Sequence, residues 1–157
     1  MTHSAKRGKA FLNFWELAGT ALLAVFVLRM WFFFPAPVLS ASMDPSLIRG
    51  EWVLVMSYPS VFYTPSNGDI IALQDSPRSM GSFKRILALP GHSIPQEYSS
   101  DFSQLALHKD DFFVIGDNML ESIDSRHFGP INSKQIQGKA ILVFWPLSSF
   151  RWIPHHD

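Results

Sequence analysis

The chain has 157 residues, 47% of them hydrophobic, and its 13 Lys+Arg balance 13 Asp+Glu. This composition excludes a disordered protein, which would be poor in apolar residues and strongly charged. It also supplies no basic excess for a general nucleic-acid-binding protein. Because there is no cysteine, disulfides, thiol nucleophiles and thiolate-bound metals are excluded as well.

The charges are unevenly distributed along the chain. Residues 1–38 contain four basic and one acidic side chain, whereas the other 119 contain nine basic and twelve acidic ones. Net neutrality therefore combines two segments of opposite charge.

Residues 10–34 form the predicted membrane segment. Its two charged residues, Glu16 and Arg29, lie toward its ends, where long side chains reach the interface. Trp15 and Trp31 bracket it, as interfacial aromatics do, and the basic residues before it predict a cytoplasmic N-terminus. We expect a cytoplasmic tail over 1–9, one transmembrane helix over 10–34, and an extracytoplasmic domain over 35–157.

A cleaved signal peptide is the alternative interpretation of this segment. Its uncharged stretch, residues 17–28, is shorter than the roughly 20 residues that cross the hydrocarbon core, and it matches the apolar region of a signal peptide. No small-x-small cleavage pattern directly follows Leu28, which favours the anchor.

After Pro37 the sequence changes to short apolar runs separated by turn-forming residues, a pattern typical of strands. No long segment with helical periodicity appears after residue 40. We expect a mostly β domain, large enough to bury its own core. The predicted strands are Glu51–Ser57, Asp69–Leu73, Phe83–Leu89, Phe112–Ile115 and Gly138–Trp145.

Three polar segments adjoin these strands: 40–47 (SASMDPSL), 84–91 (KRILALPG) and 116–129 (GDNMLESIDSRHFG). Taken separately, each has an ordinary structural interpretation. Ser42 can begin a turn, Lys84 can protect a sheet edge from aggregation, and the third segment can hold a loop ion pair. The histidines show no metal-ligand spacing, so we expect no metal site.

Taken together and in this order, the segments resemble bacterial type I signal peptidases, which are membrane-bound serine proteases with a Ser/Lys dyad. The family patterns S-x-S-M-x-P-[ST]-L, K-R-x-x-x-L-P-G and G-D-N-x-x-x-S-x-D-S-R-x-x-G match the three segments in turn. The resemblance implies a signal-peptidase-like β-sheet catalytic domain after one anchor helix. It also argues against the signal-peptide alternative, because cleavage after the apolar segment would fall on Ser42.

Dyad chemistry needs a base that activates the serine. A serine hydroxyl is a weak nucleophile until a base removes its proton, and no paired His and Asp are evident. An ordinary lysine, with a pKa of about 10.4, is charged at neutral pH, but burial among apolar residues lowers that pKa. Lys84 lies in an apolar run, whereas Lys109 does not.

The resemblance gives each matched residue a role and requires neither cofactor nor metal. One implied feature is an oxyanion hole, in which a single hydrogen-bond donor stabilises the transition state by about 3 kcal/mol. The implied roles are nucleophile for Ser42, general base for Lys84, oxyanion hole for the Ser40 hydroxyl and the Ser42 N–H, lysine orientation for Ser122, a structural ion pair for Asp124 and Arg126, and the substrate cleft for Met43.

Two positions depart from the family pattern. Met119 stands where many members have arginine, and His92 stands where aspartate often follows Pro-Gly. Only about 25 residues separate Gly91 from Gly116, too few for the large inserted second domain of many Gram-negative enzymes. We therefore expect a compact enzyme.

The expected function is removal of signal peptides from exported preproteins, after small residues at −1 and −3, at the outer face of the bacterial cytoplasmic membrane. The expected partners are preproteins and the lipid bilayer, with no nucleic acid. One alternative is a specialised maturation peptidase of the same superfamily, such as one that processes a conjugative pilin. Another is a catalytically silent, membrane-anchored module that binds peptides.

Overall fold

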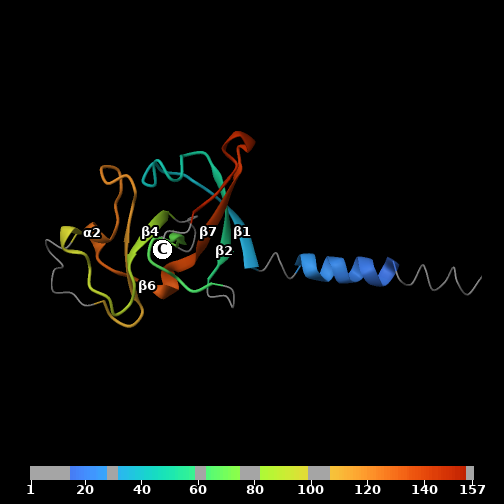
Figure 1. Cartoon of the computed structure of the whole chain (residues 1–157), viewed down its shortest axis with the longest axis horizontal. Helices are drawn as coiled ribbons and strands as arrows, with labels where there is room; N and C mark the ends of the chain where they lie inside the picture. The colour runs from blue at the N-terminus through green and yellow to red at the C-terminus, as the bar shows by residue number, and fades with distance from the viewer. Residues whose placement is uncertain (1–14, 28–31, 59–62, 75–81, 99–106, 155–157) are drawn as a thin grey trace, which may run out of the picture. The chain divides into compact units, whose positions relative to one another are not determined.

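The computed structural model describes residues 15–27, 32–58, 63–74, 82–98 and 107–154 (Figure 1). It divides into two units, residues 1–33 and 34–157. In the first unit, residues 15–27 are helical. Among the described residues, no helix is long and apolar enough to cross a membrane. The predicted tail and positions 10–14 and 28–31 of the predicted membrane segment lie outside the described residues.

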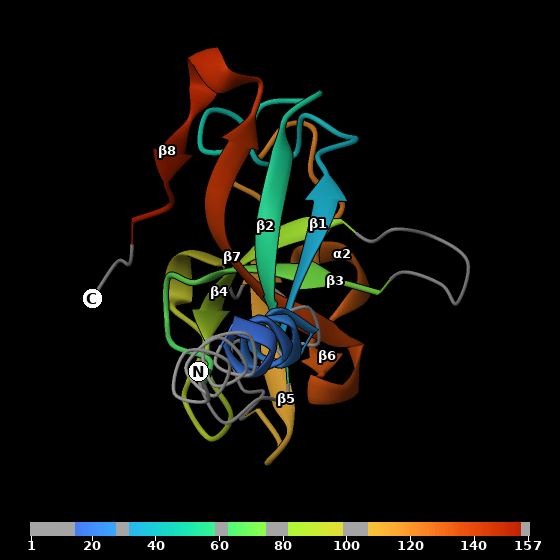
Figure 2. The same ribbon diagram turned by 90° about the vertical axis from the view of Figure 1, so that its right-hand side faces the viewer.

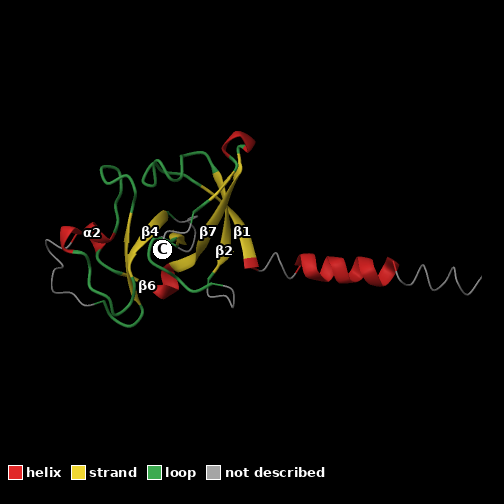
Figure 3. Ribbon diagram, viewed as in Figure 1, coloured by secondary structure: helices red, strands yellow, loops and turns green. Residues whose placement is uncertain are grey.

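The second unit is built on a curled β-sheet with only short helical turns (Figure 3). The strand order is β1-β2-β7-β3-β4-β5-β6, with β8 paired to β7, and Figure 2 shows β2 between β1 and β7. The strands are β1 Phe33–Pro37, β2 Trp52–Ser57, β3 Ile70–Leu73, β4 Phe83–Ala88, β5 Asp111–Ile115, β6 Ile131–Asn132, β7 Ile136–Trp145 and β8 Arg151–Trp152. The helix α2 covers Ser125–Phe128, and 3₁₀ turns cover Gln96–Tyr98, Ser133–Gln135 and Leu147–Ser149.

The five predicted strands correspond to β2, β3, β4, β5 and β7, with ends that differ by at most two residues. The sequence patterns did not reveal β1, β6 or β8. Because β1 begins at Phe33, the last two residues of the predicted membrane segment belong to a strand instead. Pro35 and Pro37 fit there because β1 is the first strand in the sheet order, and proline is tolerated at a sheet edge.

The core forms from inward-facing residues of β2 and β7, where Val53 and Val143 are 0% exposed and are cross-strand partners. Two residues of the loop between β1 and β2 join this core: Met43 is 1% exposed and Leu47 is 0% exposed. Burial of large apolar side chains stabilises a fold by about 1.5–3 kcal/mol each. These two side chains therefore hold the loop that contains Ser42 against the sheet.

Candidate active site

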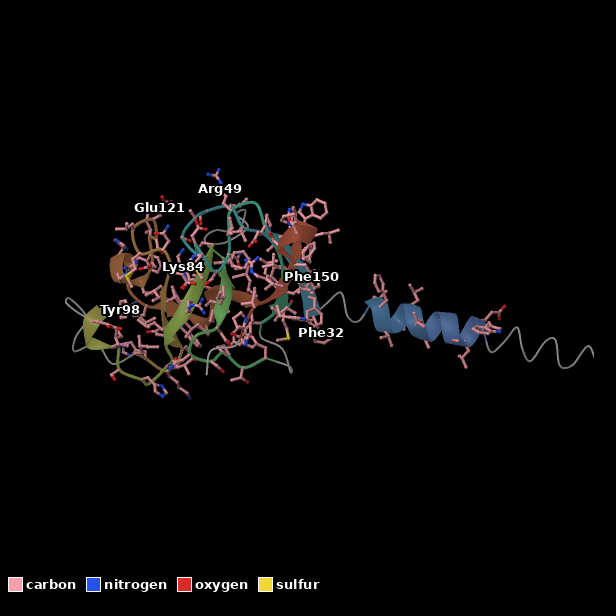
Figure 4. The ribbon with its side chains drawn as sticks, turned by 45° about the horizontal axis from the view of Figure 1, so that its top comes forward. Phe32, Arg49, Lys84, Tyr98, Glu121 and Phe150 are labelled. Carbon is pink, nitrogen blue, oxygen red and sulfur yellow. The ribbon has the colours of Figure 1, made fainter. Side chains whose placement is uncertain are left out.

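The fold brings Ser42 and Lys84 into direct contact. Ser42 lies in the loop after β1, and Lys84 is the second residue of β4. The Lys84 Nζ donates a 3.0 Å hydrogen bond to Ser42 Oγ and a 3.2 Å bond to the Phe83 carbonyl. Ser42 and Lys84 are both buried, and each is 3% exposed. Figure 4 shows Lys84 inside the domain.

Apolar neighbours account for the burial of Lys84. Its cross-strand partner on β3 is Ile71, which is 0% exposed, and Ile86 is 1% exposed two residues further along β4. Burial in such surroundings disfavours the charged form of an amine. Residues two apart on a strand face the same side, so the sequence of β4 places the amine on the buried face of the sheet.

Ser40 is the second hydroxyl at this place. Its Oγ lies 3.1 Å from Ser42 Oγ, and the residue is exposed. A hydroxyl has one donor and two acceptor sites and rotates to suit its partner. The Ser40 hydroxyl can thus reach an oxygen that develops negative charge next to Ser42 Oγ.

The loop after β5 closes the site from the other side. The N–H of Asn118 donates a 3.0 Å hydrogen bond to the carbonyl oxygen of Ser42. A Cβ at Gly116 would overlap the Ser122 hydroxyl and lie 2.5 Å from the same Ser42 carbonyl oxygen. Glycine is required at this position because the backbone of the loop approaches Ser42 so closely.

Asp124 and Arg126 anchor that loop with a buried ion pair. Arg126 donates from Nε to Asp124 Oδ1 and from Nη2 to Oδ2, both at 2.8 Å, and the Gly116 N–H donates to Oδ2 at 2.8 Å. Asp124 is 0% exposed and also caps α2. Burial alone would raise the pKa of Asp124, but Arg126 and the Gly116 N–H lower it to about 2. The carboxylate therefore stays ionised and holds the loop.

Two other predicted site residues are more deeply buried than their expected roles suggest. Ser122 is 4% exposed, and its Oγ forms no hydrogen bond with a residue that the structure describes. Ser122 nevertheless helps to lower the pKa of Asp124, after Arg126 and the Gly116 N–H. Met43 packs in the core. The lysine-orienting and cleft-lining roles remain predictions. Over the described ranges, no three His, Asp or Glu side chains cluster as metal ligands do.

One ion pair next to the dyad was not expected from the sequence. Arg85 donates to both carboxylate oxygens of Asp117, at 2.8 and 2.6 Å, and so joins β4 to the loop after β5. It also donates to the Gly68 carbonyl at 2.7 Å and to Ser46 Oγ at 3.1 Å. Both residues of this ion pair lie within the sequence motifs, since Arg85 follows Lys84 and Asp117 follows Gly116. Only the fold shows that they pair.

Comparisons with known proteins point to one family. The family model described as "Signal peptidase, peptidase S26" matches residues 11–99 and 95–145. A "Signal peptidase I P" of Bacillus subtilis subsp. natto is 31% identical and aligns with 96% of this chain and 98% of its own length. "Mitochondrial inner membrane protease subunit 2" of Saccharomyces cerevisiae is 36% identical, with coverage of 74% and 70% respectively.

A solved structure, a signal peptidase I from Enterococcus faecalis V583, covers 49% of this chain and 97% of that one, with 25% identity and a TM-score of 0.36. The family assignment rests on the sequence matches, which extend over most of the chain. The chain therefore belongs to the signal peptidase family, peptidase S26.

Proposed function

We propose that Ser42 and Lys84 form the catalytic dyad of this serine endopeptidase, which removes signal peptides from exported preproteins. The observation that carries the proposal is the 3.0 Å hydrogen bond between Lys84 Nζ and Ser42 Oγ, two buried groups at motif positions of the family. A pure peptide-binding module has no use for a buried lysine amine directed at a serine hydroxyl, so we favour the enzyme over that alternative.

In the proposed reaction, neutral Lys84 accepts the proton of Ser42 as its Oγ attacks the scissile carbonyl carbon. The Ser42 N–H and the Ser40 hydroxyl, which lies 3.1 Å from Ser42 Oγ, stabilise the oxyanion. The Lys84 ammonium then protonates the departing amine, and the signal peptide remains as an ester on Ser42. Lys84 next takes a proton from a water molecule, whose oxygen attacks the ester carbonyl carbon. The Lys84 ammonium then returns that proton to Ser42 Oγ as the signal peptide leaves with a new carboxyl group.

Supporting roles follow for the remaining motif residues. Ser122 is buried, and its hydroxyl is packed against Gly116; we assign it to orient the Lys84 amine during the reaction. Asp124 and Arg126 keep this loop in place through their ion pair. Met43 contributes to the base of the substrate cleft from its position in the core.

A membrane location is part of the same proposal: a cytoplasmic tail over 1–9, an anchor that ends before β1 begins at Phe33, and an extracytoplasmic domain that contains the sheet. The domain contributes an apolar face around the turn between β7 and β8. Trp52 and Trp145 are cross-strand partners that are 38% and 54% exposed. Leu147, Phe150 and Trp152 are 72%, 56% and 70% exposed. Apolar patches rich in tryptophan suit a bilayer interface.

A second candidate function is maturation of one specialised substrate by the same chemistry. The observation that favours it is an exposed apolar rim in the loop after β5. Met119, which departs from the family pattern, is 50% exposed, and Leu120 and Ile123 are 97% and 73% exposed. Such a rim suits an apolar substrate segment that a general enzyme does not need. Efficient cleavage of a general Ala-x-Ala precursor would exclude this candidate.

The test is cleavage of a signal-peptide precursor by the full chain in detergent. We expect Ser42→Ala and Lys84→Met each to reduce turnover by at least about 10³-fold while the protein still folds. Lys109→Met is the matched control, because Lys109 is exposed, and it should retain wild-type turnover. Wild-type-like cleavage by either dyad variant would refute the assignment.

A further inference from the structure

A second group of charged residues holds the loop that carries Ser42, and it converges on Ser46. Arg85 Nη2 donates to Ser46 Oγ at 3.1 Å, and Arg151 Nη2 donates to the Ser46 carbonyl oxygen at 2.8 Å. Arg151 comes from β8 and is 105 positions away in the sequence. Two arginines from separate strands thus bind both oxygens of a residue four positions after Ser42.

Glu51 is the counterion of Arg151. Arg151 Nη1 donates to Glu51 Oε1 at 2.6 Å and Nη2 donates to Oε2 at 2.7 Å, while the N–H of Ile48 donates to Oε2 at 3.0 Å. Burial alone would raise the pKa of Glu51, but Arg151 and the Ile48 N–H outweigh it, so the pKa lies below its ordinary value. Glu51 is therefore an anion that orients the Arg151 guanidinium.

Hydrogen bonds from the two arginines add to the packing of Met43 and Leu47 in holding the turn at Ser46. A cavity of about 170 Å³ lies among Pro45 and Ser46, the two arginines, and Ile153 and Pro154 of the C-terminal segment. Apolar side chains therefore do not fill this side of the turn. Removal of the Arg151 guanidinium would leave the Ser46 carbonyl without its 2.8 Å partner next to open space, and the turn could shift.

We propose that Arg151 is a positioning residue for the peptidase reaction. With Glu51 as its counterion, it holds the Ser46 carbonyl and so fixes the turn from which Ser42 meets Lys84. The inference rests on the proposed function of that dyad. Guanidinium geometry matters, because one planar group donates to four acceptors: both Glu51 carboxylate oxygens and the carbonyl oxygens of Ser46 and Ser149. A lysine ammonium lacks that fork.

The experiment compares the full chain with Arg151→Met, Arg151→Lys, Arg49→Met and the double variant Glu51→Met/Arg151→Met, by steady-state cleavage of one precursor and by thermal unfolding. A misplacement of about 1 Å costs on the order of 10²-fold in rate. We expect Arg151→Met to lower kcat by about 10- to 100-fold with little change in KM. Arg151→Lys should recover only part of this loss.

The double variant separates positioning from stability. Arg151→Met alone leaves the buried Glu51 carboxylate without its counterion, which is destabilising, and the double variant removes that unpaired charge. Its unfolding temperature should therefore lie above that of Arg151→Met while kcat stays low. Arg49 projects from the same loop, as Figure 4 shows, and it is exposed. Arg49→Met removes one positive charge there and should leave kcat unchanged.

Recovery of wild-type kcat by the double variant would show that Arg151 acts through stability alone, and wild-type kcat in Arg151→Met would also overturn the proposal. Cleavage that survives Ser42→Ala would instead refute the proposed function, and the positioning role would fall with it. The two failures are thus distinguished by different variants of the same protein.

Discussion

The backbone N–H of Asn118 donates a 3.0 Å hydrogen bond to the carbonyl oxygen of Ser42. This bond joins the loop after β5 to the backbone of the proposed nucleophile. It requires the two segments to approach so closely that a Cβ at Gly116 would lie 2.5 Å from the same carbonyl oxygen. The proposed dyad therefore depends on one position that carries no reactive group.

We expect Gly116→Ala to push this loop away from Ser42. Overpacking of this kind costs about 1–3 kcal/mol of stability, and the displacement should lower kcat by about 10- to 100-fold. Both are measured on the full chain, by unfolding and by precursor cleavage. Gly19→Ala is the control, because a Cβ there meets no atom within 4 Å. Unchanged kcat in Gly116→Ala would contradict the close-approach argument.

The rate of cleavage should increase with pH. An amine acts as a general base only in its neutral form, and the neutral fraction rises about tenfold per pH unit while the ammonium form predominates. Lys84 is the proposed base, so we expect kcat/KM to rise with pH and then level off. The measurement is kcat/KM between about pH 5 and pH 9, and a flat profile would argue against a titrating lysine.

Asp124 should make the domain sensitive to acid. Its pKa is about 2 in the folded state against an ordinary value of 3.8, so its contribution to stability is present above about pH 4 and is lost as the pH falls from 4 to 2. At 1.36 kcal/mol per pKa unit, this contribution is about 2 kcal/mol. Asp124→Asn should be less stable than wild type at neutral pH, and the difference should shrink below about pH 4.

Denaturant midpoints at several pH values test this expectation. Asp110→Asn is the matched control, because Asp110 is exposed, and its midpoint should follow that of the wild type at every pH. If the difference between wild type and Asp124→Asn stayed constant down to about pH 2, the proposed linkage would be wrong.

The apolar face at the turn between β7 and β8 should matter only when a bilayer is present. We expect simultaneous replacement of Leu147, Phe150 and Trp152 by serine to slow precursor cleavage in vesicles and to leave the rate in detergent unchanged. Binding to a membrane interface scales with the apolar area buried there. The measured quantity is the ratio of the two rates for the reconstituted full chain.

A matched triple variant provides the control. Leu120, Ile123 and Phe128 are 97%, 73% and 52% exposed, and Phe128 belongs to α2, away from the turn between β7 and β8 in Figure 1. Their replacement by serine removes a similar apolar area and should leave the vesicle-to-detergent ratio unchanged. Equal loss in both triple variants would mean that the face around Leu147 has no special affinity for lipid.

Much of the fold was predictable because local patterns determine it. The runs that became β2, β3, β4, β5 and β7 are apolar, short and bounded by turns. The strands β6 and β8 have two residues each, too few for a periodic pattern. The strand β1 contains two prolines, and it exists because β2 offers it an edge. A strand that is stabilised by its partner strand need not show a strand pattern in its own sequence.

The candidate site was likewise predictable only in part. The sequence by itself determined which residue types stand at the motif positions, and so identified Ser42 and Lys84 as the expected dyad. Only the tertiary structure placed Arg85 against Asp117, 32 positions away, and Arg151 against Glu51, 100 positions away. A motif records chemistry within a short stretch, whereas an ion pair between distant strands depends on strand order and register. The loop that presents Ser42 is therefore positioned by contacts that no single segment contains.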